Sequence, residues 1–130
     1  MSIDTKKFGT HIEDLVCVYL QQQKLKLITR NFTCRLGEID LIMRDQFTLV
    51  FIEVRYRKYP FFGSSLESVN RFKQNKIIKT AEFYLSSKQL NEKIACRFDV
   101  VGVKPTTPIL RNISKLDSAQ VEWVKNAFSR

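Results

Sequence analysis

The stretch Gly37-Glu38-Ile39-Asp40-Leu41-Ile42 and the stretch Val50-Phe51-Ile52-Glu53-Val54-Arg55 together indicate both a fold and a chemistry. Both are rich in residues that favour strands, and the Asp45-Gln46 link between them is short enough for a hairpin. Each stretch places a carboxylate, Asp40 or Glu53, among apolar neighbours. An ionised carboxylate in such surroundings is costly unless it has hydrogen bonds or a cation. One metal ion satisfies several carboxylates, and a metal beside basic residues favours phosphodiester chemistry.

The spacing of apolar residues predicts the elements around this hairpin. Strand-like runs cover four segments: 25–34, 37–44, 47–56 and 94–103. Helical spacing covers residues 5–23, a long segment that begins after Ser64 and ends near Ser86, and residues 118–128. The pairs Ser64/Glu67 and Asp117/Gln120 have the spacing of capping boxes, which start helices. The expected order is helix, three strands, helix, strand, helix.

The strands at 37–44 and 47–56 carry apolar residues on both faces, so both faces of their sheet must be covered. A chain of 130 residues fits one domain. We therefore expect a single domain over residues 1–130 of the α/β class, with the 37–56 hairpin at the centre of a mixed β-sheet flanked by helices on both faces.

The pleat of the strands brings the acidic side chains together. A two-residue turn at Asp45-Gln46 predicts that Glu38 lies opposite Glu53 and that Asp40 and Glu53 are diagonal neighbours, roughly 7–8 Å apart at Cα. These carboxylates would hold Mg²⁺ or Mn²⁺. Arg55, on the same face as Glu53, would stabilise a phosphate. The alternative is a structural ion pair among Arg55, Glu38 and Glu53, with Asp40 satisfied by backbone donors.

The charge balance points to a polyanionic partner. The sequence has 22 Lys and Arg against 13 Asp and Glu, a net charge of +9 and a pI of about 9.7. The basic residues are grouped: Arg57 and Lys58 come directly after the second stretch, and Lys73 and Lys76 lie on the second long helix. Such groups neutralise nucleic-acid phosphates. The alternative is that the charge only aids solubility.

The cysteines and the N-terminus bear on location. Cys17, Cys34 and Cys96 are odd in number and form no C-x-x-C pair, which favours free thiols in a reducing compartment. The first residues lack the apolar segment of a signal peptide, and no stretch is long and apolar enough to span a membrane. We expect a cytoplasmic protein with no membrane partner.

Three other polar residues lie in or beside the apolar segments. Glu13 lies beside the apolar face of the first helix, and spacing leaves open whether it turns inward as another acid or faces solvent. His11, the only histidine, cannot make a zinc site alone and is interpreted as a boundary residue. Asp99 lies inside an apolar strand, where a structural hydrogen bond or a pair with Arg97 is the expected role.

The ordered motifs resemble those of the YraN family of small, uncharacterised bacterial proteins. The resemblance runs from about Gly9 to Phe128 and is carried by four segments: 37–43, 50–57, Cys96-Arg97-Phe98-Asp99-Val100-Val101 and Val121-Glu122-Trp123-Val124. That family is grouped with nuclease-like proteins of the restriction-endonuclease fold, similar to archaeal Holliday-junction resolvases. The resemblance therefore implies a restriction-endonuclease-like sheet and a nuclease-like domain.

The resemblance also implies a PD-(D/E)xK pattern. Asp40 matches its first acid, Glu53 its second, and Arg55 stands where the pattern has lysine. Glu13 matches a first-helix glutamate that completes the metal site in resolvase-like members. The pair Lys73-Gln74 matches a Lys-Gln pair that faces the phosphate in similar sequences.

The implied activity is metal-dependent hydrolysis of phosphodiester bonds in branched or structured DNA, with Glu38 supporting the site. Unlike lysine, arginine keeps its proton, so Arg55 cannot serve as a base. A second hypothesis therefore stays open: a non-catalytic nucleic-acid-binding module in DNA repair or processing with a degenerate nuclease site. An RNA-directed role also stays open. Because junction resolvases work as symmetric dimers, a homodimer is an associated expectation.

Overall fold

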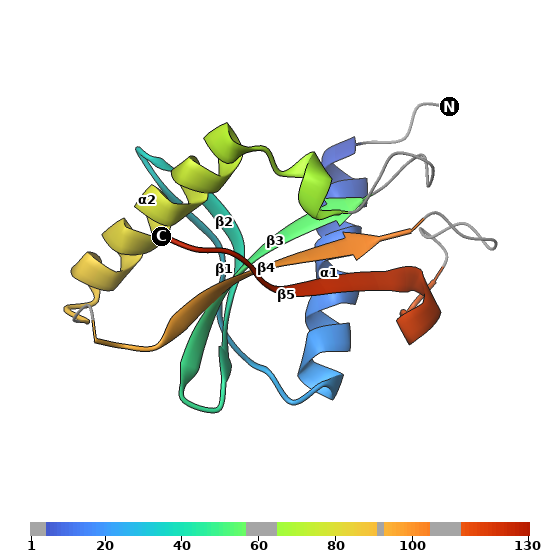
Figure 1. Ribbon diagram of the computed structural model, residues 1–130. Coiled ribbons are helices and arrows are strands. Elements are labelled where there is room, and N and C mark those ends of the chain that lie inside the picture. The colour runs from blue at the N-terminus through green and yellow to red at the C-terminus, as the bar shows by residue number, and fades with distance from the viewer. Residues whose placement is uncertain (1–4, 57–64, 91–92, 105–112) are drawn as a thin grey trace.

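The computed structural model describes residues 5–56, 65–90, 93–104 and 113–130 (Figure 1). Within these ranges the chain forms two α-helices, α1 (Thr5–Gln22) and α2 (Arg71–Ser87). It also forms five strands: β1 (Lys26–Cys34), β2 (Gly37–Asp45), β3 (Thr48–Tyr56), β4 (Cys96–Val103) and β5 (Val121–Phe128). Short 3-10 turns precede α2 and β5, at η1 (Leu66–Ser68) and η3 (Ser118–Gln120).

The strands form one mixed sheet in the order β1-β2-β3-β4-β5. Neighbouring strands are antiparallel except for β3 and β4, which run parallel and are connected through α2. The sheet separates the two helices, with α1 on one side and α2 on the other (Figure 1). The predicted α/β class, with a mixed sheet flanked by helices on both faces, is confirmed, and the hairpin predicted at its centre supplies β2 and the central strand β3.

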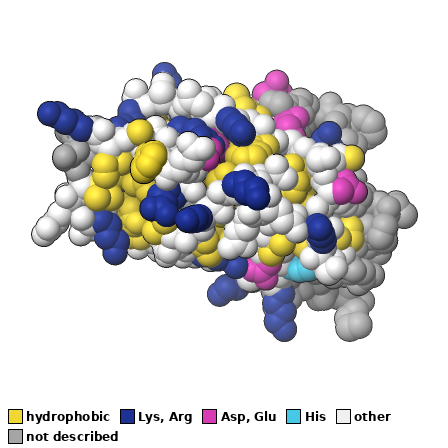
Figure 2. Space-filling model, turned by 90° about the horizontal axis from the view of Figure 1, so that it is seen from below, with side chains coloured by type: hydrophobic (Ala, Val, Ile, Leu, Met, Phe, Trp, Pro, Cys, Tyr) yellow, Lys and Arg dark blue, Asp and Glu magenta, His cyan; other side chains and the backbone are white. Residues whose placement is uncertain are grey.

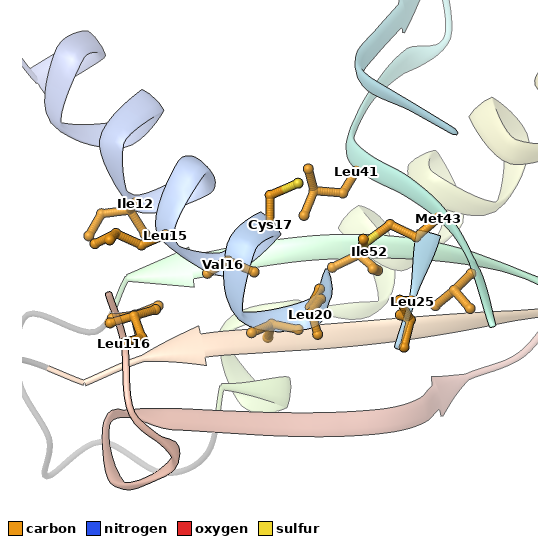
Figure 3. Close-up of a cluster of buried hydrophobic side chains, with 13 residues drawn as sticks. Ile12, Leu15, Val16, Cys17, Leu20, Leu25, Leu41, Met43, Ile52 and Leu116 are labelled. Carbon is orange, nitrogen blue, oxygen red and sulfur yellow. The ribbon is translucent and has the colours of Figure 1, made fainter. Parts of the chain in front are cut away.

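Each face of the sheet carries its own apolar core. On the α1 side, helix residues spaced three and four apart pack on alternate residues of the strands (Figure 3), among them Ile12, Leu15, Val16, Leu20, Leu41, Met43 and Ile52. On the α2 side, helix residues such as Ile77, Ala81 and Tyr84 pack on strand residues such as Ile42, Phe51 and Phe98. Because both faces are covered, β2 and β3 carry apolar residues at successive positions.

The second helix begins later than the sequence predicted. Asn70 is its N-cap residue, and the Asn70 side chain accepts a hydrogen bond of 2.9 Å from the Lys73 N–H. Ser64, the expected capping residue, lies outside the described residues. The helix ends at Ser87, one residue beyond the expected end.

The predicted helix over residues 118–128 is wrong. The capping box of Asp117 and Gln120 is present, but it caps only the single turn η3, after which the chain continues as β5. Val121 and Trp123 pack against the α1 core, whereas Val124 and Phe128 pack against the α2 core. An edge strand with apolar residues on both faces thus places them at intervals that imitate a helix.

The predicted hairpin register is wrong by two residues. Asp45 pairs with Thr48, so the turn residues are Gln46 and Phe47 rather than Asp45 and Gln46. A shift of two residues keeps every side chain on its expected face. It moves Asp40 from a diagonal position to the position directly opposite Glu53, one step beyond the Leu41–Ile52 pair.

Asp99 is structural, as expected. Its carboxylate is fully buried and accepts hydrogen bonds from Arg97 Nε (3.1 Å), Trp123 Nε1 (2.9 Å) and the Asn126 N–H (2.9 Å). Arg97 Nη1 also donates to Asp45 Oδ2 at 3.0 Å. This network joins β4 to β5 and to the end of β2.

No helix in the described parts of the chain is long and apolar enough to cross a membrane. All three cysteines are free thiols, with Cys17 buried and Cys34 and Cys96 half-buried.

Candidate functional site

A pocket of about 150 Å³ opens between the β2–β3 hairpin and α2. Acidic groups line it from the strands and cations from the helix; its lining is Gly37, Glu38, Glu53, Arg55, Lys73, Lys76 and Ile77. Gly37 lets α2 lie close to the start of β2, because a Cβ there would stand 2.8 Å from Thr80 Oγ1. Its φ of +154° is also a conformation that other residues rarely adopt. The pocket therefore joins two of the acids predicted from the sequence to two of the predicted lysines.

Asp40 and Glu53 form the most perturbed pair of ionisable groups beside this pocket. Asp40 Oδ2 accepts a 2.8 Å hydrogen bond from the Val54 N–H, and the Asp40 and Glu53 carboxyl groups lie close enough to shift each other's pKa. Burial and the neighbouring Glu53 charge raise the pKa of Asp40 to about 8. Burial also raises the pKa of Glu53, while its contact with Asp40 and the charges of Arg55 and Lys73 oppose that rise. Near neutral pH the pair therefore retains a proton.

Glu13 and Glu38 lie on either side of Asn31, which the sequence interpretation missed. Asn31 Nδ2 donates to Glu13 Oε1 at 2.9 Å and to Glu38 Oε1 at 3.2 Å. Asn31 has a φ of +52°, a conformation that asparagine tolerates better than most residues. It lies on β1 level with Asp40, between the Arg30–Leu41 and Phe32–Ile39 pairs. An asparagine in a strand-like run was the only sequence signal for this role.

The carboxylates near Asp40 supply some of the oxygen ligands that a divalent cation requires. Among the described residues, no three His, Cys, Asp or Glu side chains stand together as a ready metal site. Asp40 and Glu53 are in contact, and the Glu13 charge contributes to the raised pKa of Asp40. Glu13, however, is held by Asn31 and lies 3.7 Å from Arg30 Nη2. Two adjacent carboxylates fit Mg²⁺, which commonly takes one or two carboxylates and keeps several waters.

Arg55 is held by the loop that precedes α2. Its Nε donates to Ser68 Oγ at 3.0 Å and its Nη2 to the Ser68 carbonyl oxygen at 3.1 Å, while Nη1 lies 3.9 Å from Glu53 Oε1. Ser68 Oγ in turn donates to the Ser65 carbonyl oxygen at 2.6 Å. The guanidinium thus joins β3 to η1 and has one edge directed at Glu53. The Arg55–Glu53 contact and the Val54 hydrogen bond to Asp40 are two features of the structural alternative, in which Arg55 pairs with acids and a backbone donor satisfies Asp40.

The remaining predicted residues differ in their placement. Lys73 and Lys76 line the pocket, and the Lys73 charge acts on Glu53. Gln74 is not among the lining residues; its Nε2 donates to the Val69 carbonyl oxygen at 2.9 Å. Arg57 and Lys58 lie outside the described residues. His11, expected at a boundary, is half-buried on α1.

Phe72 was missed as a candidate. Its side chain is 72% exposed at the start of α2, and Lys76 Nζ lies 5.9 Å from the centre of its ring. A phenylalanine on the solvent side of a helix beside two lysines of a pocket is the signal that could have identified it.

Comparison with known proteins supplies the family. Residues 12–103 match the model of UPF0102, an uncharacterised protein family that corresponds to the YraN resemblance. A UPF0102 protein of Coxiella burnetii is 46% identical over 124 residues, which cover 95% of this chain and 93% of that protein. One of Psychromonas ingrahamii is 48% identical over 122 residues, covering 92% and 88% respectively. One of Nitrosococcus oceani is 42% identical over 120 residues, covering 92% and 90%.

Proposed function

We propose that this chain, which belongs to the UPF0102 family of uncharacterised proteins, is a metal-dependent endonuclease acting on branched or structured DNA. The observation that carries the proposal is the contact between the Asp40 and Glu53 carboxyl groups beside a pocket whose helical wall is cationic. Burying two acids in contact costs folding free energy. A divalent cation that lets both ionise is a functional reason to retain them.

Asp40 and Glu53 would hold Mg²⁺ or Mn²⁺, and Glu13 would join them by turning away from Asn31. When bound, such an ion lowers the pKa of water and neutralises charge on a phosphate. The Val54 N–H orients the Asp40 carboxylate through its hydrogen bond to Oδ2. Glu38 would support the site by remaining hydrogen-bonded to the Asn31 amide and so holding that side chain in place when Glu13 leaves it.

Lys73 and Lys76 are the pocket cations best suited to bind the phosphate backbone. Both are on one wall of the pocket, and neither has an ion pair or hydrogen bond from its ammonium group to another described residue that competes with an anion. Lys73 would replace the lysine that the PD-(D/E)xK pattern has at position 55. Arg55, held by Ser68, would position Glu53 and stabilise charge that develops on the phosphate.

Branched or structured DNA is the favoured substrate because unpaired bases need a surface on which to stack. The exposed ring of Phe72 next to Lys76 offers one beside the pocket. The net charge of +9 favours a nucleic-acid partner in general. We further propose a cytoplasmic location, for which free thiols are typical, and a homodimer, because a junction presents two symmetric cleavage positions.

A second candidate function is a nucleic-acid-binding module in DNA repair or processing that does not cleave. Two observations favour it: the described residues contain no ready three-ligand metal site, and Arg55 stands where the pattern has lysine. In that case binding would depend on the lysines and would weaken steeply with salt, because phosphate contacts release counterions.

Cleavage of end-labelled DNA separates the two functions. The substrates are a four-way junction, a flap, a single strand and a duplex of the same sequence, each with Mg²⁺, Mn²⁺ or EDTA. The proteins are wild type, Asp40→Asn, Glu53→Gln and, as a matched control, Glu82→Gln, which removes an exposed carboxylate from α2. Binding is measured on the same samples by mobility shift.

The nuclease proposal predicts metal-dependent cutting that is lost in both site variants and kept in Glu82→Gln. Loss of at least 100-fold is expected, about 3 kcal/mol of transition-state stabilisation. Binding by all four proteins with no cutting under any condition would reject the nuclease and leave the binding module. Equal cutting by all four would assign the activity to a contaminant or to another site.

A further inference from the structure

A second pocket, of about 350 Å³, lies at the turn end of the β2–β3 hairpin. Its lining residues are basic, amide or aromatic: Lys24, Lys26, Arg44, Gln46 and Phe47. None of them lines the pocket at the Gly37 end of β2. The sequence interpretation and the proposed function give none of the five a role in binding or catalysis.

The cations of this pocket are placed against one another. Lys26 on β1 is the direct cross-strand partner of Arg44 on β2, and Lys24 precedes them at the end of the α1–β1 turn. Like charges directly opposite each other in a sheet are destabilising. In the ranges that the structure describes, none of the three makes an ion pair with an acidic side chain. A bound anion would relieve this repulsion.

Phe47 stands beside these cations with 94% of its side chain exposed. An aromatic ring left in water contributes almost nothing to folding, since it buries no surface. The turn that carries it is tight: Asp45 pairs with Thr48, and Gln46 has a φ of +54°. The ring is therefore held at the tip of a short hairpin, where its faces are open to a ligand.

We propose that this hairpin-end surface, made of Lys24, Lys26, Arg44 and Phe47, binds an unpaired segment of nucleic acid. The cations would contact successive phosphates and the ring of Phe47 would stack on a base, the combination used by proteins that bind single strands. An acidic peptide would satisfy the cations but give the exposed ring no planar partner. The inference rests on the proposed function only in taking nucleic acid as the ligand.

The position of the surface suits a strand that also reaches the Asp40–Glu53 pair. Arg44 lies four residues after Asp40 on β2, about 14 Å at 3.4 Å per residue. That span corresponds to about four nucleotides of stacked strand. Figure 2 views the molecule from the side where the turn lies in Figure 1, and in its left half Lys and Arg side chains border exposed hydrophobic atoms. The surface would therefore hold the unpaired arm of a branched substrate.

The test is the affinity for a fluorescein-labelled single strand of about 12 nucleotides, within the usual site sizes. Fluorescence anisotropy is measured across a salt series without divalent metal. The variants are Phe47→Ala, Phe47→Leu, Phe47→Trp and the double variant Lys26→Ala/Arg44→Ala. Lys104→Ala, an exposed lysine at the end of β4, is the control for loss of one charge. Thermal unfolding confirms that each variant is folded.

Phe47→Ala is expected to weaken binding by roughly 5- to 150-fold, the loss of one stacked base. Phe47→Leu should behave like Phe47→Ala, because it keeps apolarity but loses the ring, and Phe47→Trp should restore the affinity. The double variant should reduce the slope of log K against log salt by about 1.4, or 0.7 for each phosphate contact. Lys104→Ala should bind as wild type does.

Wild-type affinity in Phe47→Ala and in the double variant would overturn the inference. If the double variant instead keeps its affinity and self-associates, the paired cations only protect the edge strand β1. Equal displacement of the oligonucleotide by poly-glutamate, with no effect of Phe47→Leu, would assign the surface to acidic peptides. If wild type cleaves DNA but the variants bind the single strand as well as wild type does, only the hairpin-end surface is rejected. If the variants lose binding but wild type never cleaves, only the nuclease activity is rejected.

Discussion

Asp40 and Glu53 lie opposite each other on adjacent strands, with their carboxyl groups close enough to shift each other's pKa, beside a pocket lined by two lysines. The pair retains a proton near neutral pH, because burial and the Glu53 charge raise the pKa of Asp40 to about 8, and burial also raises the pKa of Glu53. A proton and a divalent cation would therefore compete for the same oxygens, and this competition makes the proposed metal site measurable without any nucleic acid.

The first prediction concerns folding stability. Since the pKa of Asp40 is raised to about 8, the folded protein binds more protons than the unfolded chain between about pH 4 and pH 8. The free energy of unfolding of wild type should therefore fall as pH rises through this window and level off above it. Asp40→Asn removes this titration, so the free energy of unfolding of the variant should depend less on pH. Between pH 5 and pH 8 its stability relative to wild type should rise by on the order of 1–3 kcal/mol. Urea unfolding measures it, and parallel profiles would contradict it.

The second prediction concerns metal binding. Because Asp40 and Glu53 must lose their shared proton to ligate a cation, Mn²⁺ should raise the melting temperature more at pH 8 than at pH 5.5. The increase should disappear in Glu53→Gln. An equal Mn²⁺ effect at both pH values, or in the variant, would place cation binding elsewhere. Glu13→Gln should reduce the effect without abolishing it, given the influence of Glu13 on Asp40.

The third prediction separates Lys73 from Arg55. Lys73→Ala should lower cleavage by about 10²-fold or more while leaving stability near that of wild type, since the side chain is exposed at the pocket. Arg55→Ala should lower stability by about 1–3 kcal/mol, because it leaves the Ser68 carbonyl and hydroxyl groups without their donors. Urea unfolding and the junction cleavage assay measure the two effects. A stability loss in Lys73→Ala equal to that of Arg55→Ala would contradict this division.

The fourth prediction assigns Asp99 to the fold alone. Asp99→Asn removes the buried negative charge that is paired with Arg97 and should lower the free energy of unfolding by about 3 kcal/mol. At a temperature where the variant remains folded, its affinity for DNA should match that of wild type. A selective loss of DNA binding without a loss of stability would show that this carboxylate acts in function.

The fold was largely predictable because its local signals agree with its tertiary packing. The helix expected over residues 5–23 spans Thr5–Gln22, and the hairpin strands were expected within one residue of their observed ends. The largest difference is β5, where the Asp117 capping box indicated a helix that the pairing of Val121 and Trp123 with β4 overrode. Local capping fixes one turn, whereas pairing with a neighbouring strand decides the conformation of the residues beyond that turn.

The site was predictable only in part, because its contacts depend on side chains that spacing does not reveal. Alternation along β2 and β3 brought Asp40 and Glu53 to one face even though the expected register was wrong by two residues. The bridging role of Asn31 and the anchoring of Arg55 by Ser68 could not be foreseen, because the first depends on a positive φ at Asn31 and the second on the conformation of the turn before α2. Lys73 was expected to face phosphate, but its position on the pocket wall opposite Glu53 depends on how α2 packs on the sheet.

The most direct test of a catalytic metal site at Asp40 and Glu53 is the rate of four-way junction cleavage by wild type and Asp40→Asn across pH 6 to pH 9 with saturating Mn²⁺. If Asp40 and Glu53 hold the catalytic ion, the wild-type rate should rise with pH as their shared proton is lost, and Asp40→Asn should not cleave at any pH. Cleavage by Asp40→Asn at the wild-type rate, or no cleavage by wild type at any pH, would contradict the claim.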